Sequence, residues 1–135
     1  MLSLQTCLGC HLPPCLRRVK VLEPSGMIKR YAAIVDPKSV GLPISIFVNV
    51  SLHSQERSSL EKFEEKIAKY VEIMECYLMT GSSDYVLRVV VPDLDSYERF
   101  LAEKLTRTPG VANIQSSFTL KQVVYKTELP LQNQD

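Results

Sequence analysis

Alternating apolar and polar residues dominate the second half of the chain. Between residues 44 and 52, every second position carries a large aliphatic side chain. Successive strand residues point to opposite faces of a sheet, so this alternation predicts a half-buried strand. The alternation returns over residues 72–80, is interrupted by Gly81, and resumes over residues 85–91. The two runs predict strands joined by a short loop. A last strand is expected after Gly110, with these side chains on one side: Ile114, Phe118, Leu120 and Val124.

Two amphipathic helices are predicted between these strands. In the first, Ser58 and Glu61 form a possible capping box, and apolar residues follow at helical spacing: Leu60, Phe63, Ile67 and Val71. In the second, Asp93 or Asp95 is the expected N-cap, and Thr108, Pro109 and Gly110 end the helix. Its expected inner face consists of Leu94, Tyr97, Leu101 and Leu105.

The predicted order is strand, helix, strand, strand, helix, strand. This order is typical of an α+β ferredoxin-like sandwich, in which two helices cover one face of an antiparallel four-stranded sheet. Two helices leave the other face open. We expect that face, which carries Phe47, Val86, Val90 and Tyr125, to meet another subunit.

A short basic helix is predicted near the start of the chain, over residues 14–26. Pro14 suits its first turn, and Pro24, Ser25 and Gly26 end it. One stripe is apolar, formed by Leu16, Val19, Val21 and Leu22. The basic residues Arg17, Arg18 and Lys20 project elsewhere, where they either attract phosphate or form a solvated helix face. Residues 28–36 are expected to form an extra connecting strand long enough to pair with a neighbouring chain.

Charge and cysteine content narrow the function further. Residues 1–30 carry five basic side chains against one acidic one, although the net charge of the whole chain is only +1. Any contact with nucleic acid therefore belongs to this first segment. No export signal and no apolar run long enough to cross a membrane are apparent, so we expect a cytoplasmic chain with reduced thiols and no membrane partner.

The first cysteines form a CxxCH pattern, Cys7 to His11, which is also the attachment signature of haem. The pattern has three interpretations: attachment of covalent haem, a zinc site that includes Cys15, or a chance occurrence. Chance occurrence is favoured. We expect no metal and no cofactor. The sequence also contains no recognisable catalytic constellation, so we do not expect an enzyme.

Three separated motifs resemble the Lrp/AsnC, or feast/famine, family of transcription regulators. They are PCLRRVKVLEPSGMIKRYAAIVDPKSVGL, TGSSDYVLRVVV and SSFTLKQVVYKTELPL, and the resemblance spans roughly residues 14–131. It implies an amino-terminal helix-turn-helix that reads DNA, a linker strand, and a ferredoxin-like domain. In that family the last domain dimerises through its sheet and binds amino acids, and four dimers commonly form an octamer.

The resemblance divides the chain into three parts. Residues 1–26 correspond to a partial helix-turn-helix, residues 27–42 to the linker strand, and residues 43–135 to the domain for ligand binding and oligomerisation. By similarity, the DNA-contact positions are Pro14, Cys15, Arg17, Arg18 and Lys20. The residues before this segment leave no room for the first helix of the family's DNA-binding domain. Because the other helices of a helix-turn-helix hold the recognition helix in place, we expect impaired DNA binding. The alternatives are weak nonspecific binding by an oligomer, and a stand-alone sensing module that assembles with full-length relatives.

The loop between the middle strands has the chemistry to bind a free amino acid. Such a ligand presents a carboxylate and an ammonium, which require clustered donors and one acidic partner. Backbone amides near Gly81 and the hydroxyls of Ser82 and Ser83 can donate, and Asp84 can accept from the ammonium. By resemblance, the effector-binding residues are Thr80, Gly81, Ser82, Ser83, Asp84 and Tyr85.

Two other interpretations stay open. For the loop, the alternative is a polar hairpin in which Asp84 bonds its own turn. For the whole chain, the alternative is a dimeric, cofactor-independent oxygenase of ferredoxin-like fold, which would need a polar or histidine-lined cavity on the sheet. No histidine falls on any predicted strand.

Overall fold

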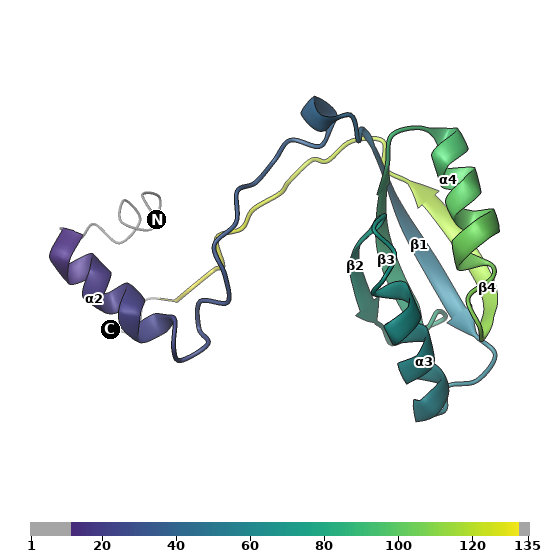
Figure 1. Ribbon diagram of the computed structural model, residues 1–135, viewed down its shortest axis with the longest axis horizontal. Helices are drawn as coiled ribbons and strands as arrows, with labels where there is room; N and C mark the ends of the chain where they lie inside the picture. Colours follow the sequence, from purple (N-terminus) through teal and green to yellow (C-terminus); the bar gives the residue numbers. More distant parts are fainter. Residues whose placement is uncertain (1–11, 133–135) are drawn as a thin grey trace. The chain divides into compact units, whose positions relative to one another are not determined.

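The computed structural model describes residues 12–132, which form two compact units divided after Val35. The larger unit contains an antiparallel sheet in the order β2-β3-β1-β4. Helices α3 and α4 lie on one face of this sheet (Figure 1). The predicted ferredoxin-like sandwich is therefore confirmed. Its elements are β1 (Ile44–Leu52), α3 (Arg57–Ile67), β2 (Ile73–Leu78), β3 (Tyr85–Val91), α4 (Leu94–Phe100), the π-helical turn η2 (Leu101–Leu105) and β4 (Val111–Phe118), preceded by the short 3₁₀ turn η1 (Lys38–Val40).

The core lies between the sheet and the two helices. Alternate residues of the central strands β1 and β3 point into it, so Val48 and Leu87 are paired in register and both fully buried. Phe63 from α3 and Phe100 from α4 close the core from the helix side. This burial of one face of each strand provides the main stabilisation of the unit.

The predicted last strand is too long. Strand β4 ends at Phe118, and one further backbone bond joins the Thr119 amide to the Ser45 carbonyl. Beyond this point the chain has no strand partner among the described residues, and Leu120 is completely exposed. Leu120, Val124 and Tyr125 therefore do not belong to the sheet.

Helix α3 differs from the prediction at both ends. It begins after the N-cap Glu56, whose side chain makes no capping bond, so the predicted capping box is wrong. The helix ends at Ile67, and Val71 is exposed, because the chain turns there toward β2.

Of the two predicted N-caps of helix α4, Asp93 occupies the position, and its Oδ1 accepts a hydrogen bond of 2.7 Å from the Ser96 amide. The predicted inner face is partly wrong, since Leu94 is exposed and Phe100 is buried. After Phe100 the helix widens into η2, where the Thr106 amide bonds the Leu101 carbonyl five residues back. This wider turn shifts the periodicity on which the prediction relied.

The smaller unit contains helix α2 (Leu12–Leu22), which ends before the predicted end at Gly26. A turn over residues 23–26 follows, and Gly26 in it has a φ of 81°. Cys15 and Val19 are buried, whereas Val21 is exposed, so the apolar stripe runs through Cys15 instead of Val21. The connecting strand predicted over residues 28–36 is wrong, because this segment has no strand to pair with within the described chain. Among residues 12–132, no helix is long and apolar enough to cross a membrane.

Candidate functional site

The loop that joins β2 to β3 has a defined geometry. The Met79 amide donates to the Asp84 carbonyl at 2.8 Å and closes the loop. Gly81 has a φ of 116°, which side chains other than glycine rarely adopt. Thr80, Gly81 and Ser82 are exposed, and Ser83 is partly exposed. The loop therefore exposes Gly81 and the neighbouring hydroxyl-bearing residues, as its composition predicts.

Asp84 ties this loop to the end of β1. Its Oδ2 accepts a bond of 2.7 Å from the Leu52 amide and one of 3.3 Å from Nε2 of Gln55. Its own amide donates to the Val50 carbonyl at 3.0 Å. The carboxylate thus bonds the β1–α3 connection and not its own turn. Its second oxygen, Oδ1, accepts no hydrogen bond from residues 12–132.

Tyr85 lies beneath the loop, in the core. Its ring is buried against Phe63, with 4.7 Å between the ring centroids, and its hydroxyl donates to Oε1 of Glu64 at 2.6 Å. Burial raises the pKa of Tyr85 well above its ordinary value, and the bond to the Glu64 carboxylate raises it further. Tyr85 thus supports the loop from within the core.

A hollow of about 370 Å³ lies between α3 and β2 and extends along β2 to the β2–β3 loop. Leu78 and Tyr85, the residues at the two bases of the loop, both line it, together with Glu64. Cys76 lines it as well, and burial raises the pKa of this thiol to about 11. The sequence did not indicate Gln55 or Glu64, because only the tertiary fold brings the β1–α3 connection and α3 to the hairpin.

The open face of the sheet combines an exposed aromatic ring with an ion pair. Phe47 on β1 is 44% exposed. Beside it in the sheet, Nε of Arg88 lies 2.7 Å from Oε2 of Glu75, and this hydrogen bond lowers the pKa of Glu75. A hollow of about 730 Å³ extends over this face to residues 119–124. The predicted open-face residues Phe47, Val86 and Val90 lie on β1 and β3 as expected.

The predicted DNA-contact residues all lie on α2. Pro14, Arg17, Arg18 and Lys20 are exposed, and Arg18 takes part in a further interaction. Cys15, by contrast, is buried. The helix therefore presents a basic surface on the side opposite its buried residues.

The possible metal ligands Cys7, Cys10 and His11 lie outside the described residues. Among the residues that are described, no cluster of histidine, cysteine or acidic side chains could hold a metal ion.

Sequence comparison matches residues 45–129 to the Lrp/AsnC ligand binding domain. The Bkd operon transcriptional regulator of Pseudomonas aeruginosa is 46% identical over 123 residues, which cover 91% of this chain and 80% of that protein. An uncharacterized HTH-type transcriptional regulator of Sinorhizobium fredii is 46% identical over 116 residues, covering 86% of this chain and 91% of the relative. These relatives are regulators, in agreement with the prediction that the chain is not an enzyme.

A transcriptional regulator from Neisseria meningitidis, solved in complex with L-methionine, has the same fold. The two structures superpose with a TM-score of 0.81 at 37% identity, over 87% of this chain and 75% of the other. The sequence match, the shared fold and the motifs on the β2–β3 hairpin agree. The chain belongs to the Lrp/AsnC family of transcriptional regulators.

Proposed function

We propose that this protein is an amino-acid-responsive transcriptional regulator whose effector binds at the β2–β3 loop. The observation that supports the proposal is the loop itself, in which exposed residues surround Gly81 while Asp84 holds the loop to β1. A related regulator was solved with L-methionine, which makes an amino acid the natural class of ligand to test.

Each end of an amino acid has a suitable partner in this loop. The ligand carboxylate accepts from backbone amides near Gly81 and from the hydroxyls of Ser82 and Ser83. The ammonium donates to Oδ1 of Asp84, the oxygen that accepts no bond from the described residues. Because Oδ2 is already bonded to the Leu52 amide, the carboxylate is oriented before the ligand arrives. Such preorganisation lowers the entropy cost of binding.

We propose that the open face of the sheet forms the interface of a dimer, and that dimers assemble further into an octamer. Exposed Phe47 supplies an apolar anchor, and the Arg88–Glu75 pair supplies a charged partner beside it. Aromatic residues and arginine are the side chains most enriched in protein interfaces. Light scattering coupled to gel filtration measures the assembly, and Phe47→Glu is expected to shift the mass toward a monomer.

The basic surface of α2 is the proposed contact with DNA. Arg17 and Lys20 are exposed there, and cationic side chains on a helix bind phosphates in a salt-dependent manner. Fluorescence anisotropy at physiological salt tests this contact. Reversing the charge at Arg17 and Lys20 should weaken binding at least tenfold, while reversal at Arg57, which is exposed on α3, should leave it unchanged. Equal affinity for all three proteins would refute the assignment.

Calorimetry against the twenty amino acids tests the effector site. At least one amino acid should bind at millimolar concentration or tighter, and Asp84→Asn should abolish its heat signal. Asp93→Asn is the matched control, because it makes the same chemical change to a hydrogen-bonded aspartate at the start of α4. Binding by none of the twenty, or equal binding by both variants, would refute the proposed effector site.

A further inference from the structure

A second hollow lies at the other end of the β2–β3 hairpin. It has a volume of about 340 Å³ and is bounded by the start of β2, the end of β3, α4 and η2. Its polar lining consists of Glu72, Ser96, Arg99, Glu103 and Lys104. The β2 strand has six residues and separates this hollow from the Thr80–Tyr85 loop by about 20 Å. The two places are therefore independent.

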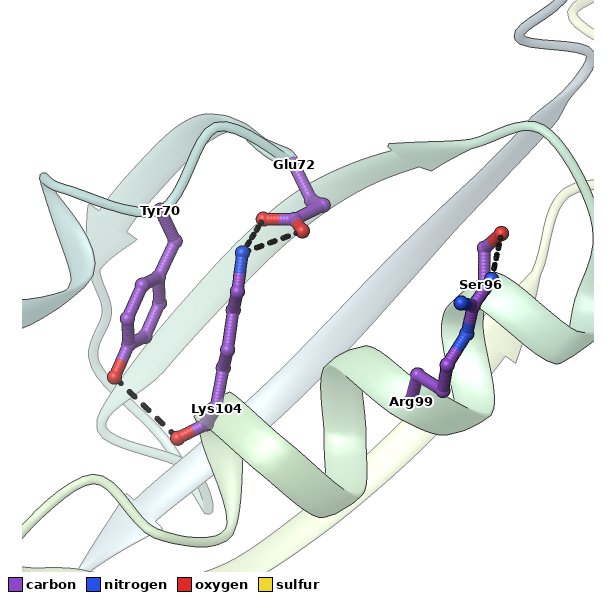
Figure 2. Close-up of polar contacts among 5 residues, drawn as sticks. All are labelled: Tyr70, Glu72, Ser96, Arg99 and Lys104. Carbon is purple, nitrogen blue, oxygen red and sulfur yellow. Dashed lines mark hydrogen bonds and ion pairs between the residues drawn. The ribbon is translucent and has the colours of Figure 1, made fainter.

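Two of the charged side chains in this hollow form an ion pair with each other. Nζ of Lys104 lies 2.7 Å from Oε1 and 3.0 Å from Oε2 of Glu72, and both side chains are partly buried (Figure 2). The same ammonium lies 5.8 Å from the centre of the Tyr70 ring. This pair joins η2 to the start of β2.

The backbone that carries Lys104 is also well anchored. Its carbonyl accepts from the hydroxyl of Thr108 at 2.8 Å and from the hydroxyl of Tyr70 at 3.3 Å. Thr108 is buried, and its hydroxyl lies 2.8 Å from that of Tyr70. Wide π-helical turns of this kind occur frequently at functional sites. The wall formed by η2 is therefore preorganised.

Two other charges in the hollow are not paired with each other. Arg99 Nη2 makes a hydrogen bond of 3.3 Å to the Ser96 hydroxyl (Figure 2). Hydrogen bonds from Ser96 lower the pKa of Asp93, and the charge of Arg99 lowers it further. Within residues 12–132, no carboxylate lies within ion-pairing distance of Arg99 and no cation lies within that distance of Glu103. The two residues are four apart, but arginine preceding glutamate is the weaker order for such a pair. A guanidinium and a carboxylate thus line one hollow without neutralising each other.

We propose that this hollow is a second ligand site, specific for a small zwitterion of the α-amino acid type. The guanidinium of Arg99 binds the ligand carboxylate through two parallel hydrogen bonds, and the Ser96 hydroxyl donates a third. The carboxylate of Glu103 accepts from the ligand ammonium, and the Lys104–Glu72 pair forms the rigid wall. Val91 and Phe100 line the hollow with apolar surface. A ligand that carries only a carboxylate or only an ammonium leaves either Glu103 or Arg99 without a partner.

Amide NMR during titration with the twenty amino acids tests this site. The amides of residues 96–104 should shift saturably with at least one amino acid. Propionate and ethylamine, which carry one charge each, should bind at least about tenfold more weakly, because each loses one charge-assisted contact. Absence of saturable shifts in residues 96–104 with every amino acid would overturn the proposal, as would equal binding of propionate.

Variants of Arg99 separate this site from the effector loop. Arg99→Gln should weaken the response of residues 96–104 at least about tenfold and leave that of residues 80–85 within about twofold, since distant sites act independently. Arg57→Gln, which removes the same charge from α3, should change neither response. If residues 80–85 of the wild-type protein do not respond while residues 96–104 do, the proposed function is refuted but this site is not. An unchanged response of residues 96–104 in Arg99→Gln would refute this site alone.

Discussion

Charged side chains are arranged in opposite ways near the two ends of the β2–β3 hairpin. At the loop end, the Asp84 carboxylate is bonded to the backbone of β1 and to Gln55. At the open end, Arg99 and Glu103 line a hollow without pairing, beside the satisfied pair of Lys104 and Glu72.

Asp84 is a charge that holds the fold, whereas Arg99 and Glu103 are charges that are available to a ligand. A bonded carboxylate stabilises the loop and orients its free oxygen. Unpaired surface charges contribute little to stability, so their placement in one hollow is better explained by binding. Substitutions at the two ends should accordingly differ in their effect on unfolding.

The largest loss of stability is expected for Asp84→Ala. It leaves the amide of the buried residue Leu52 without its acceptor, which should lower the free energy of unfolding by about 2 kcal/mol. Urea denaturation measures this change. Asp93→Ala removes a carboxylate that caps α4 at the exposed surface, and its loss should be smaller. An equal loss in the two variants would contradict the anchoring role of Asp84.

A smaller loss, of about 1 kcal/mol, is expected for Gly81→Ala. The methyl group meets no neighbouring atom, so the whole cost comes from the φ of 116°. Ser82→Ala, at the next exposed position, is the control and should be close to neutral. Thermal unfolding compares the two. Equal melting temperatures would mean that the loop relaxes to another backbone conformation.

Tyr85→Phe should cost about 1 kcal/mol at neutral pH, because the hydrogen bond to Glu64 is lost. The pKa of Tyr85 is raised in the folded state, so the neutral hydroxyl stabilises the fold below the unfolded pKa of about 10. That stabilisation is lost as the pH rises from about 10 toward the higher folded pKa. The wild-type protein should therefore lose more stability than Tyr85→Phe between neutral and strongly alkaline pH. Parallel pH profiles would contradict this assignment.

A double-mutant cycle on Lys104→Met and Glu72→Gln should give a coupling of about 0.5–1 kcal/mol, since the pair is partly buried. The same cycle on Arg57 and Glu61, an exposed pair on α3, should give a smaller value. Denaturant midpoints supply both couplings. A larger value for the exposed pair would show that Lys104 and Glu72 do not fix the wall of the hollow.

The smallest effect on stability is expected at Arg99. Replacing this residue by Gln removes no ion pair with any described carboxylate, and the melting temperature should stay close to that of the wild-type protein. Differential scanning calorimetry without added ligand tests this expectation. A marked decrease in melting temperature would place Arg99 among the charges that hold the fold.

The strands with one buried face were the most predictable from sequence. The boundaries of β1 and β3 agree with the alternating runs at residues 44–52 and 85–91, because burial on one side imposes a period of two. Strand β2 is shorter than its run, and its pairing with β3 shifts between Ile73 and Glu75. Leu120 continued the pattern of β4 without having a partner strand.

The ends of helices and the contacts of the loop were less predictable. Val71 and Leu94 fit helical spacing but lie outside the core, because local spacing does not show where the chain turns away. Residues 80–85 were recognised from composition and family resemblance. The bond from the Leu52 amide to Asp84 joins residues 32 apart, so only the folded sheet reveals it. The role of the loop in ligand binding and that of α2 in DNA binding stay predictions.

Effector binding by the Thr80–Tyr85 loop can be measured on the loop itself. NMR follows the backbone amides of this loop while an amino acid that gives a calorimetric signal is added. The amides of Gly81, Ser82 and Ser83 should show saturable shifts that fit the calorimetric affinity and disappear in Asp84→Asn. Unchanged amides in residues 80–85 at a saturating concentration of that amino acid would contradict effector binding by this loop.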